Sequence, residues 1–243
     1  MANNILFVFE GERTEKQITK SLTQYFINEN TIVQCAYCAE IYQLYRQISN
    51  DEDLDTFELL KQIPQNANLL QAYQRDDFAE IYMFFDYDGH SSIADDEKLK
   101  EALAFFNEET KFGRLFISYP MVEALKHFSD SMDFMNLKVK AKENISYKQI
   151  VDKESNNDLK QVTKYSKTVW IQLIELHLKK MNYISNGNNK LPTNLITQSE
   201  IFLNQLDKYI CKDLTVAVLS SFPIFIFDYY GIDYILKLVS EKK

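Results

Sequence analysis

The sequence predicts an α/β fold, in which a parallel sheet carries helices on both faces, followed by a mainly helical C-terminal subdomain. The first half of the chain alternates short apolar runs with stretches of helical periodicity, a pattern typical of parallel sheets. This alternation stops near Lys140, and most later stretches have a helical pattern. We therefore expect two regions, a core of residues 1–138 and a C-terminal subdomain of residues 139–243.

Four apolar runs are predicted strands, since each is continuous enough to be covered on both faces of a sheet. They are residues 3–9, 31–37, 80–86 and 113–120. Five helices are predicted between and after these strands. They span residues 12–30, 39–49, 55–64, 95–109 and 121–134. The first has Ile18, Leu22 and Phe26 at helical spacing, and the fourth has the acidic first turn that a helix dipole favours.

The C-terminal region is predicted to hold helices at residues 156–185 and 193–213 and a closing helix at residues 232–243. The apolar run between them, residues 214–231, reads as strand-like or buried. The first of these helices has a large apolar face, which we expect to pack on the core or on a second identical chain. That face comprises Val169, Trp170, Leu173, Ile174, Leu176 and Leu178. A homodimer is therefore left open.

Composition bounds the environment of the protein. The net charge is −8 over 243 residues, so there is no overall basic surface for nucleic acid. The basic stretches 136–144 and 176–182 are interpreted as solvated helix faces. The N-terminus lacks a basic leader, and no apolar run reaches the ~18 residues of a membrane span. We expect a cytoplasmic protein with no membrane partner.

The three cysteines do not form a metal-binding pattern. Cys35 and Cys38 make a single C-x-x-C, without the second pair of ligands that a zinc site requires. We interpret them as ordinary buried cysteines.

Carboxylates follow three of the predicted strands. Glu10 ends the first strand and Glu15 lies one turn into the next helix, while Asp86 and Asp88 end the third strand and Glu123 begins the helix after the fourth. Ligands of open α/β sheets bind beyond the carboxyl ends of the strands. We therefore expect these five side chains to converge at one edge of the sheet.

Convergent carboxylates repel one another unless a cation lies between them. Hard oxygen ligands of this number and charge suit Mg²⁺ or Mn²⁺. Asp86 and Asp88 are two residues apart, so their side chains point the same way, and Gly89 lets the chain turn away after them. Each signal alone also fits a helix cap or a turn; their joint position at three strand ends favours a metal site.

These residues carry a resemblance to a known family. The stretches FVFEGERTEKQI (residues 7–18), MFFDYDGH (83–90) and FISYPMVEALKHF (116–128) occur in the order seen in TOPRIM nucleases. They most resemble the RloB and AbiLii branch, which is related to the OLD-family nucleases. The resemblance covers roughly the first 130 residues. It departs from the family at Tyr119, where asparagine is usual, and after Glu123, where an aromatic residue is typical.

The resemblance implies a TOPRIM-like core and a metal-dependent phosphodiesterase. Glu10, Asp86 and Asp88 would be the catalytic residues and metal ligands, and Glu15 and Glu123 would complete a second metal position. Divalent ions would neutralise the charge that develops on the phosphorus oxygens and would activate a water. The candidates for phosphate contact are Arg13, Lys16, Lys126 and His127.

The same resemblance implies a cellular setting. Such nucleases occur in bacterial anti-phage systems of the abortive-infection type, often beside an ABC-type ATPase. The sequence lacks the G-x-x-x-x-G-K-[ST] motif, so an ATPase would be a separate chain. The substrate would be DNA or a structured RNA such as tRNA.

Two alternatives stay open beside the nuclease. The chain would be non-catalytic if its TOPRIM-like core served as a binding or regulatory subunit of such a complex. A phosphotransferase of the haloacid-dehalogenase kind also has a D-x-D motif, but that motif follows the first strand, whereas Asp86 and Asp88 follow at least two strands.

Overall fold

The computed structural model describes residues 3–11, 13–28, 30–39, 41–51, 54–87, 89 and 95–241. The chain divides into two compact units. The first comprises residues 1–85 and 95–116, and the second residues 86–94 and 117–243. The predicted boundary between residues 138 and 139 falls within the second unit, at the start of its strand β6 (Lys138–Lys140).

A mostly parallel sheet forms the centre of the first unit and confirms the predicted α/β class. Its strands run in the order β2-β1-β3-β5-β4, and β1 pairs in parallel with both β2 and β3. The strand bounds are β1 Asn3–Phe9, β2 Thr31–Tyr37, β3 Phe78–Asp86, β4 Asn107–Glu108 and β5 Gly113–Ser118.

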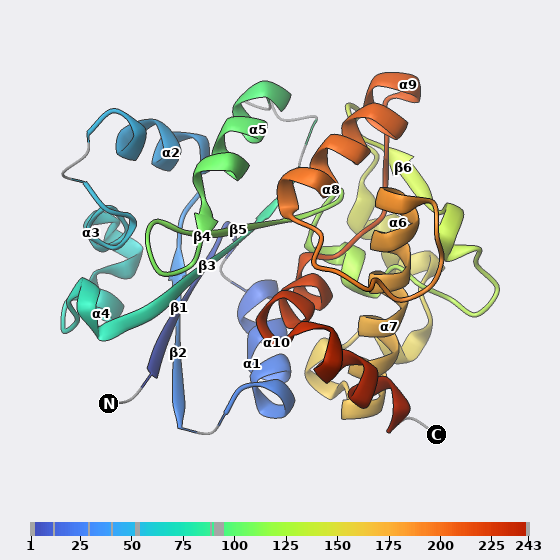
Figure 1. Ribbon diagram of the computed structural model, residues 1–243, viewed down its shortest axis with the longest axis horizontal. Coiled ribbons are helices and arrows are strands. Elements are labelled where there is room, and N and C mark those ends of the chain that lie inside the picture. The colour runs from blue at the N-terminus through green and yellow to red at the C-terminus, as the bar shows by residue number, and fades with distance from the viewer. Residues whose placement is uncertain are drawn as a thin grey trace. The chain divides into compact units, whose positions relative to one another are not determined.

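Helices flank both faces of this sheet. Figure 1 shows α1 on one side and α2, α3 and α5 on the other, as right-handed crossovers require for this strand order. Their bounds are α1 Thr14–Phe26, α2 Ile41–Ser49, α3 Thr56–Gln62, α4 Ala67–Leu70 and α5 Asp96–Phe105. Short 3₁₀ turns lie at Pro64–Asn66 and Arg75–Asp77.

The second unit is mainly helical, as predicted for the C-terminal half. Its α-helices are α6 Tyr147–Glu154, α7 Lys167–Asn186, α8 Gln198–Gln205, α9 Cys211–Asp213 and α10 Ser221–Ser240. A π-helical turn, Leu206–Ile210, joins α8 to α9. The 3₁₀ turns are Val122–Lys126, Phe134–Asn136, Asn157–Leu159 and Val162–Lys164. Strands β6 and β7 (Thr215–Ala217) form an antiparallel pair.

The apolar face of α7 is buried largely within its own unit. Trp170, Leu173, Ile174 and Leu178 are buried, and α7 packs against α8 and α10. This packing covers most of the apolar face that suggested a homodimer. The homodimer itself stays a prediction.

The helix expected over residues 156–185 begins at Lys167, after two 3₁₀ turns, and the closing helix expected over 232–243 is the end of α10. Four further predicted elements differ in kind from the observed ones. The helix expected over residues 95–109 ends at Phe105, and β4 then pairs antiparallel with β5. The helix expected over 121–134 is reduced to two 3₁₀ turns, because residues 122–125 are all buried and offer no polar face.

The other two differences lie further along the chain. The basic stretch 136–144, expected on a helix, contains β6. The apolar run 214–231 contributes only β7 before α10 begins, because a short apolar run does not distinguish a strand from a buried helix.

Two side-chain amides pair with the backbone at the ends of strands. In the first unit, Asn66 Oδ1 accepts from the Tyr37 N–H at 2.7 Å and its Nδ2 donates to the Tyr37 carbonyl at 2.8 Å. In the second unit, Gln205 Oε1 accepts from the Ala217 N–H at 2.9 Å and its Nε2 donates to the Ala217 carbonyl at 2.8 Å. Both amides are buried and satisfy backbone groups that water cannot reach.

Candidate functional site

The predicted carboxylates are divided between the two units. Glu10 and Glu15 belong to the first unit, whereas Asp86 and Glu123 belong to the second. Asp88 lies outside the described residues. The convergence of all five side chains on one site therefore stays a prediction, and each unit is described by itself.

In the first unit, Gly11 is the point where Glu15 meets the end of β1. A Cβ atom added at Gly11 would lie 2.5 Å from Glu15 Oε1, so no other residue fits without displacing that carboxylate. Glu15 is buried in the first turn of α1. Gly11 thus lets the buried carboxylate of Glu15 lie against the backbone directly after Glu10.

Glu10 lies within electrostatic reach of Tyr42 on α2. The pKa of Tyr42 is raised to about 12, mainly by burial, and the charges of Asp96, Asp95 and Glu10 add to the rise against a backbone hydrogen bond from Asp95. Glu10 therefore faces the same region as the beginning of α5. The electrostatics of this region disfavour further negative charge.

The basic candidates of the first unit, Arg13 and Lys16, are both exposed at the start of α1. Lys16 lies close enough to Cys35 to oppose the burial that raises the pKa of this thiol to about 11. Cys35, Cys38 and Cys211 are free thiols. Only Cys38 is fully buried, so the expected burial of the C-x-x-C pair is confirmed for one of its two members.

In the second unit, Asp86 ends β3 and Gly89 stands in the turn that follows. A Cβ atom at Gly89 would lie 2.5 Å from Cε1 of Tyr87 and 2.7 Å from the carbonyl oxygen of Ala141. Gly89 is therefore required by close packing against that ring and the loop after β6.

Glu123 is the most unusual carboxylate of the second unit. Its side chain is only 5% exposed, and its Oε1 lies 3.6 Å from Lys148 Nζ. Among the described residues, Oε2 is buried and has no hydrogen-bond partner. A buried charged oxygen without a partner costs several times the free energy of a neutral one. Glu123 is therefore a candidate ligand for a cation.

A hydrogen-bonded series, Glu154–His127–Tyr147, lies beside Glu123, and its members His127 and Tyr147 are buried. His127 Nδ1 is 2.9 Å from the Tyr147 hydroxyl, and His127 Nε2 is 3.2 Å from Glu154 Oε2. A carboxylate only accepts, so Nε2–H donates to Glu154 and the Tyr147 hydroxyl donates to Nδ1. Burial lowers the pKa of His127, against the raising effect of Glu154.

The pKa of the Tyr147 hydroxyl depends on the carboxylates that lie near it. Burial raises the pKa of Tyr147 well above 10, and the charges of Glu123, Asp86 and Glu154 raise it further. Asp86 and Glu123 therefore both lie within electrostatic range of the same buried phenol. The structure brings these two of the five predicted carboxylates into one region.

The two basic candidates of the second unit, Lys126 and His127, already interact with other side chains of the same unit. His127 is fully buried, with both ring nitrogens in hydrogen bonds, and Lys126 Nζ lies 3.9 Å from Asp152 Oδ1. Their contact with a phosphate stays a prediction. Sequence reasoning missed Tyr147, Lys148 and Glu154, which lie in no motif and reach the site only through α6.

The donor set of the second unit fits a hard divalent cation. Asp86 and Glu123 supply carboxylate oxygens, the donor type that Mg²⁺ and Mn²⁺ prefer, and the buried Oε2 of Glu123 lacks a partner among the described residues. Within the described ranges, which omit Asp88, no cluster of three or more His, Cys, Asp or Glu side chains is arranged as a metal site.

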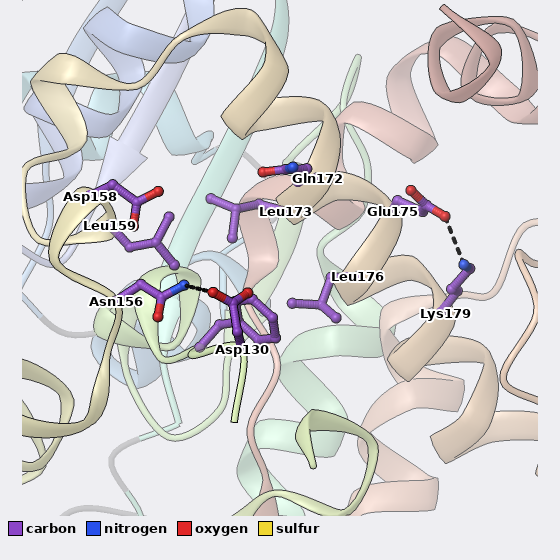
Figure 2. Close-up of a pocket in the computed structure, with 10 residues that line it drawn as sticks. Asp130, Asn156, Asp158, Leu159, Gln172, Leu173, Glu175, Leu176 and Lys179 are labelled. Atoms are coloured by element: carbon purple, nitrogen blue, oxygen red, sulfur yellow. Dashed lines mark hydrogen bonds and ion pairs between the residues drawn. The ribbon is translucent and has the colours of Figure 1, made fainter. Parts of the chain in front are cut away.

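Two cavities open in the second unit. One, of about 290 Å³, lies at the beginning of α6 and includes Tyr147 and Lys148 in its wall. The other, of about 460 Å³, is shown in Figure 2; its wall contains the hydrogen-bonded pair Asp130–Asn156 and the ion pair Glu175–Lys179. The smaller cavity thus shares residues with the candidate site.

Comparisons with protein-family models, curated proteins and solved structures return no match for this chain. None of the described helices is long and apolar enough to cross a membrane. Function is therefore inferred from the residues of this chain alone.

Proposed function

We propose that this protein is a divalent-metal-dependent nuclease that hydrolyses phosphodiester bonds in DNA or in a structured RNA such as tRNA. The observation that carries the proposal is the buried, unpartnered Oε2 of Glu123, in the same region as Asp86. A folded protein keeps such an oxygen when a ligand satisfies it. The resemblance of the sequence to TOPRIM nucleases implies that this ligand is Mg²⁺ or Mn²⁺.

In this proposal Asp86 and Glu123 are cation ligands within the second unit, and Glu10, Glu15 and Asp88 stay predicted ligands. The bound cation supplies charge neutralisation on the phosphorus oxygens and lowers the pKa of a coordinated water. Glu10 is the candidate general base.

Lys148 has a distinct role in the same proposal. Its side chain is 65% exposed, yet its Nζ lies 3.6 Å from Glu123. Lys148 compensates the buried carboxylate when no cation is present, and it is free to turn toward a phosphate when one is bound. Arg13, Lys16, Lys126 and His127 stay candidates for phosphate contact.

The proposed setting is an anti-phage system in which a separate ABC-type ATPase acts as partner. The net charge of −8 gives the chain little attraction of its own for nucleic acid. The proposed ATPase would therefore deliver the substrate to the nuclease or release it from inhibition.

The first experiment measures cation binding without any substrate. Thermal unfolding of the parent chain should shift upward as Mn²⁺ is added, because a ligand that binds only the folded state stabilises it. Glu123→Gln should abolish most of this shift, since an amide is a poor ligand for a hard cation. Asp207→Asn changes the same chemistry at an exposed residue and should keep the parental shift.

The second experiment measures cleavage of DNA and of total tRNA with Mn²⁺, with and without an ATPase encoded nearby. Glu10→Ala, Asp86→Asn and Asp88→Asn should each reduce the cleavage rate on the order of a hundredfold or more. They should not lower the melting temperature of the metal-free protein, because removing one of several clustered like charges relieves repulsion.

Two outcomes would decide against the nuclease. Parental cleavage by Glu10→Ala at a normal melting temperature would contradict the assigned chemistry. Mn²⁺ binding with no cleavage of either substrate, even beside the ATPase, would instead favour the non-catalytic regulatory subunit.

A further inference from the structure

The second unit carries a local strip of lysines in a protein that is acidic overall. Lys138 and Lys140 are exposed at alternate positions of β6, so their side chains point the same way. Lys142 continues the series and places its Nζ 5.3 Å from the ring centre of Tyr87. The strip therefore runs beside the turn that follows Asp86.

The carboxylates that pair with these lysines compete only weakly with a phosphate for them. Lys138 pairs with Asp213, and Lys140 Nζ lies 3.8 Å from Glu143 Oε1. The paired side chains are about half exposed, and surface pairs of this kind contribute little net free energy. A phosphodiester, which presents two anionic oxygens, can displace them.

The cavity of about 290 Å³ at the start of α6 lies next to this strip, with Lys140 and Lys148 in its wall. Its wall also includes the apolar residues Pro120, Met121 and Ile145. Asn144 and Gln149 add amide groups, which are able to donate to and accept from the edge of a base.

The cavity adjoins the candidate catalytic region through two residues. Lys148 extends from its wall to within 3.6 Å of Glu123, and Tyr147 is hydrogen-bonded to His127 at 2.9 Å. A ligand in the cavity would thus place its neighbouring phosphate toward Glu123 and Asp86.

We propose that this cavity receives one unpaired nucleotide of the substrate strand, with the flanking phosphates held by Lys140 and Lys148. The inference rests on the proposed nuclease function and narrows its substrate to single-stranded or looped nucleic acid. A base that is stacked and paired within a duplex cannot enter the cavity, whereas an unpaired base can.

The chemistry of the wall favours a nucleotide over a simple anion. Apolar side chains contact the faces of any base, the amides meet its polar edge, and the lysines neutralise the backbone. An inorganic anion would use only the lysines.

The test measures binding of fluorescently labelled oligothymidylate, oligouridylate and a blunt hairpin duplex by anisotropy, in EDTA so that no cleavage occurs. The parent chain should bind one or both single strands more tightly than the duplex. Preference between the two single strands would identify DNA or RNA as the source of the nucleotide.

Ile145→Asp should weaken single-strand binding at least about fivefold, since contact with one base contributes a factor of this order or more. It removes an apolar wall residue and adds one negative charge. Asn188→Asp adds the same charge at an exposed residue outside the cavity and should leave affinity within about twofold of the parent.

A second pair of variants tests the phosphate contacts. Lys140→Glu should weaken single-strand binding and lower the dependence of affinity on salt by about one counterion. Lys164→Glu makes the same charge change at an exposed residue that does not line the cavity and should keep the parental salt dependence. Melting curves of all four variants report whether each remains folded.

Three results would overturn the inference: no binding of either single strand by the parent, equal binding of the duplex, or parental single-strand affinity in both Ile145→Asp and Lys140→Glu. The proposed function fails separately. Cavity-dependent binding without Mn²⁺-dependent cleavage would refute the nuclease alone, and cleavage that is indifferent to these substitutions would refute the nucleotide site alone.

Discussion

His177 provides a test of how the second unit responds to acid. This residue of α7 is fully buried, and its Nδ1 accepts a hydrogen bond at 3.2 Å from the N–H of Ser220, the residue that precedes α10. Burial lowers the pKa of His177 from 6.5 to about 3, with the Leu125 carbonyl opposing this change and the charge of Lys180 adding to it. Protonation of Nδ1 would also set its proton against the Ser220 N–H.

The sign of the effect follows from which state binds the proton. Below pH 6.5 the unfolded chain protonates His177 and the folded chain does not, so stability falls as the pH is lowered. The complete difference between 6.5 and about 3 corresponds to roughly 5 kcal/mol, and the part between 6.5 and about 4.5 to roughly 2 to 3 kcal/mol.

The substitution to make is His177→Asn, because the amide oxygen replaces Nδ1 as an acceptor for Ser220 without titrating. Loss of the ring, which packs edge-on against Phe134 at 5.0 Å, should destabilise the variant on the order of 2 kcal/mol at about pH 8. Its further loss of stability between pH 6.5 and about 4.5 should be smaller than that of the parent by the roughly 2 to 3 kcal/mol assigned to His177.

Urea unfolding followed by tryptophan fluorescence measures this difference. The single tryptophan, Trp170, is buried on the same helix as His177 and reports the second unit. Phe134→Leu is the matched control, since it disrupts the same ring contact but removes no titrating group, and it should keep the parental pH dependence. Equal pH dependence of the parent and His177→Asn would refute the reasoning.

Two further predictions concern buried polar groups of the second unit. Lys180 is buried with Nζ 2.6 Å from the Phe134 carbonyl and 2.5 Å from the Leu137 carbonyl, and burial lowers its pKa to about 7. The unfolded chain therefore binds more protons between pH 7 and 10.5, stability should rise with pH across this window, and Lys180→Met should remove that rise in urea titrations. Gln205→Leu leaves the N–H and carbonyl of Ala217 unpaired and should destabilise the second unit by roughly 2 to 4 kcal/mol at all pH values, whereas a loss below about 1 kcal/mol would contradict the role of this amide.

Strands β1, β2, β3 and β5 were predictable because each is a continuous apolar run next to a helix of regular period. The positions of Glu10 and Asp86 at strand ends, and of Glu15 in the first turn of the following helix, were read from the same pattern. β4 was not predictable, because two exposed residues, Asn107 and Glu108, carry no periodicity of their own.

The surroundings of Glu123 were beyond sequence reasoning for a different reason. Tyr147, Lys148 and Glu154 are separated from Glu123 by more than twenty residues of the chain, and α6 alone brings them to it. Its short helical pattern indicates a helix but says nothing of which neighbour that helix meets. The helix expected over residues 121–134 did not form for a reason that also lies in tertiary structure, because the burial of residues 122–125 overrides a favourable local pattern.

The amide of Asn66 has a consequence for the behaviour of many copies of this protein together. β2 is the outer strand of its sheet, and Tyr37 is its last residue. An outer strand presents unpaired peptide groups that a strand from another molecule can extend. The Asn66 side chain is hydrogen-bonded to both the backbone N–H and the carbonyl of Tyr37, so a strand of another molecule cannot pair with this end of β2. Asn66→Ala would leave the N–H and carbonyl of Tyr37 unpaired. A strand from a second molecule would then be able to pair with them, and the protein would self-associate at this edge.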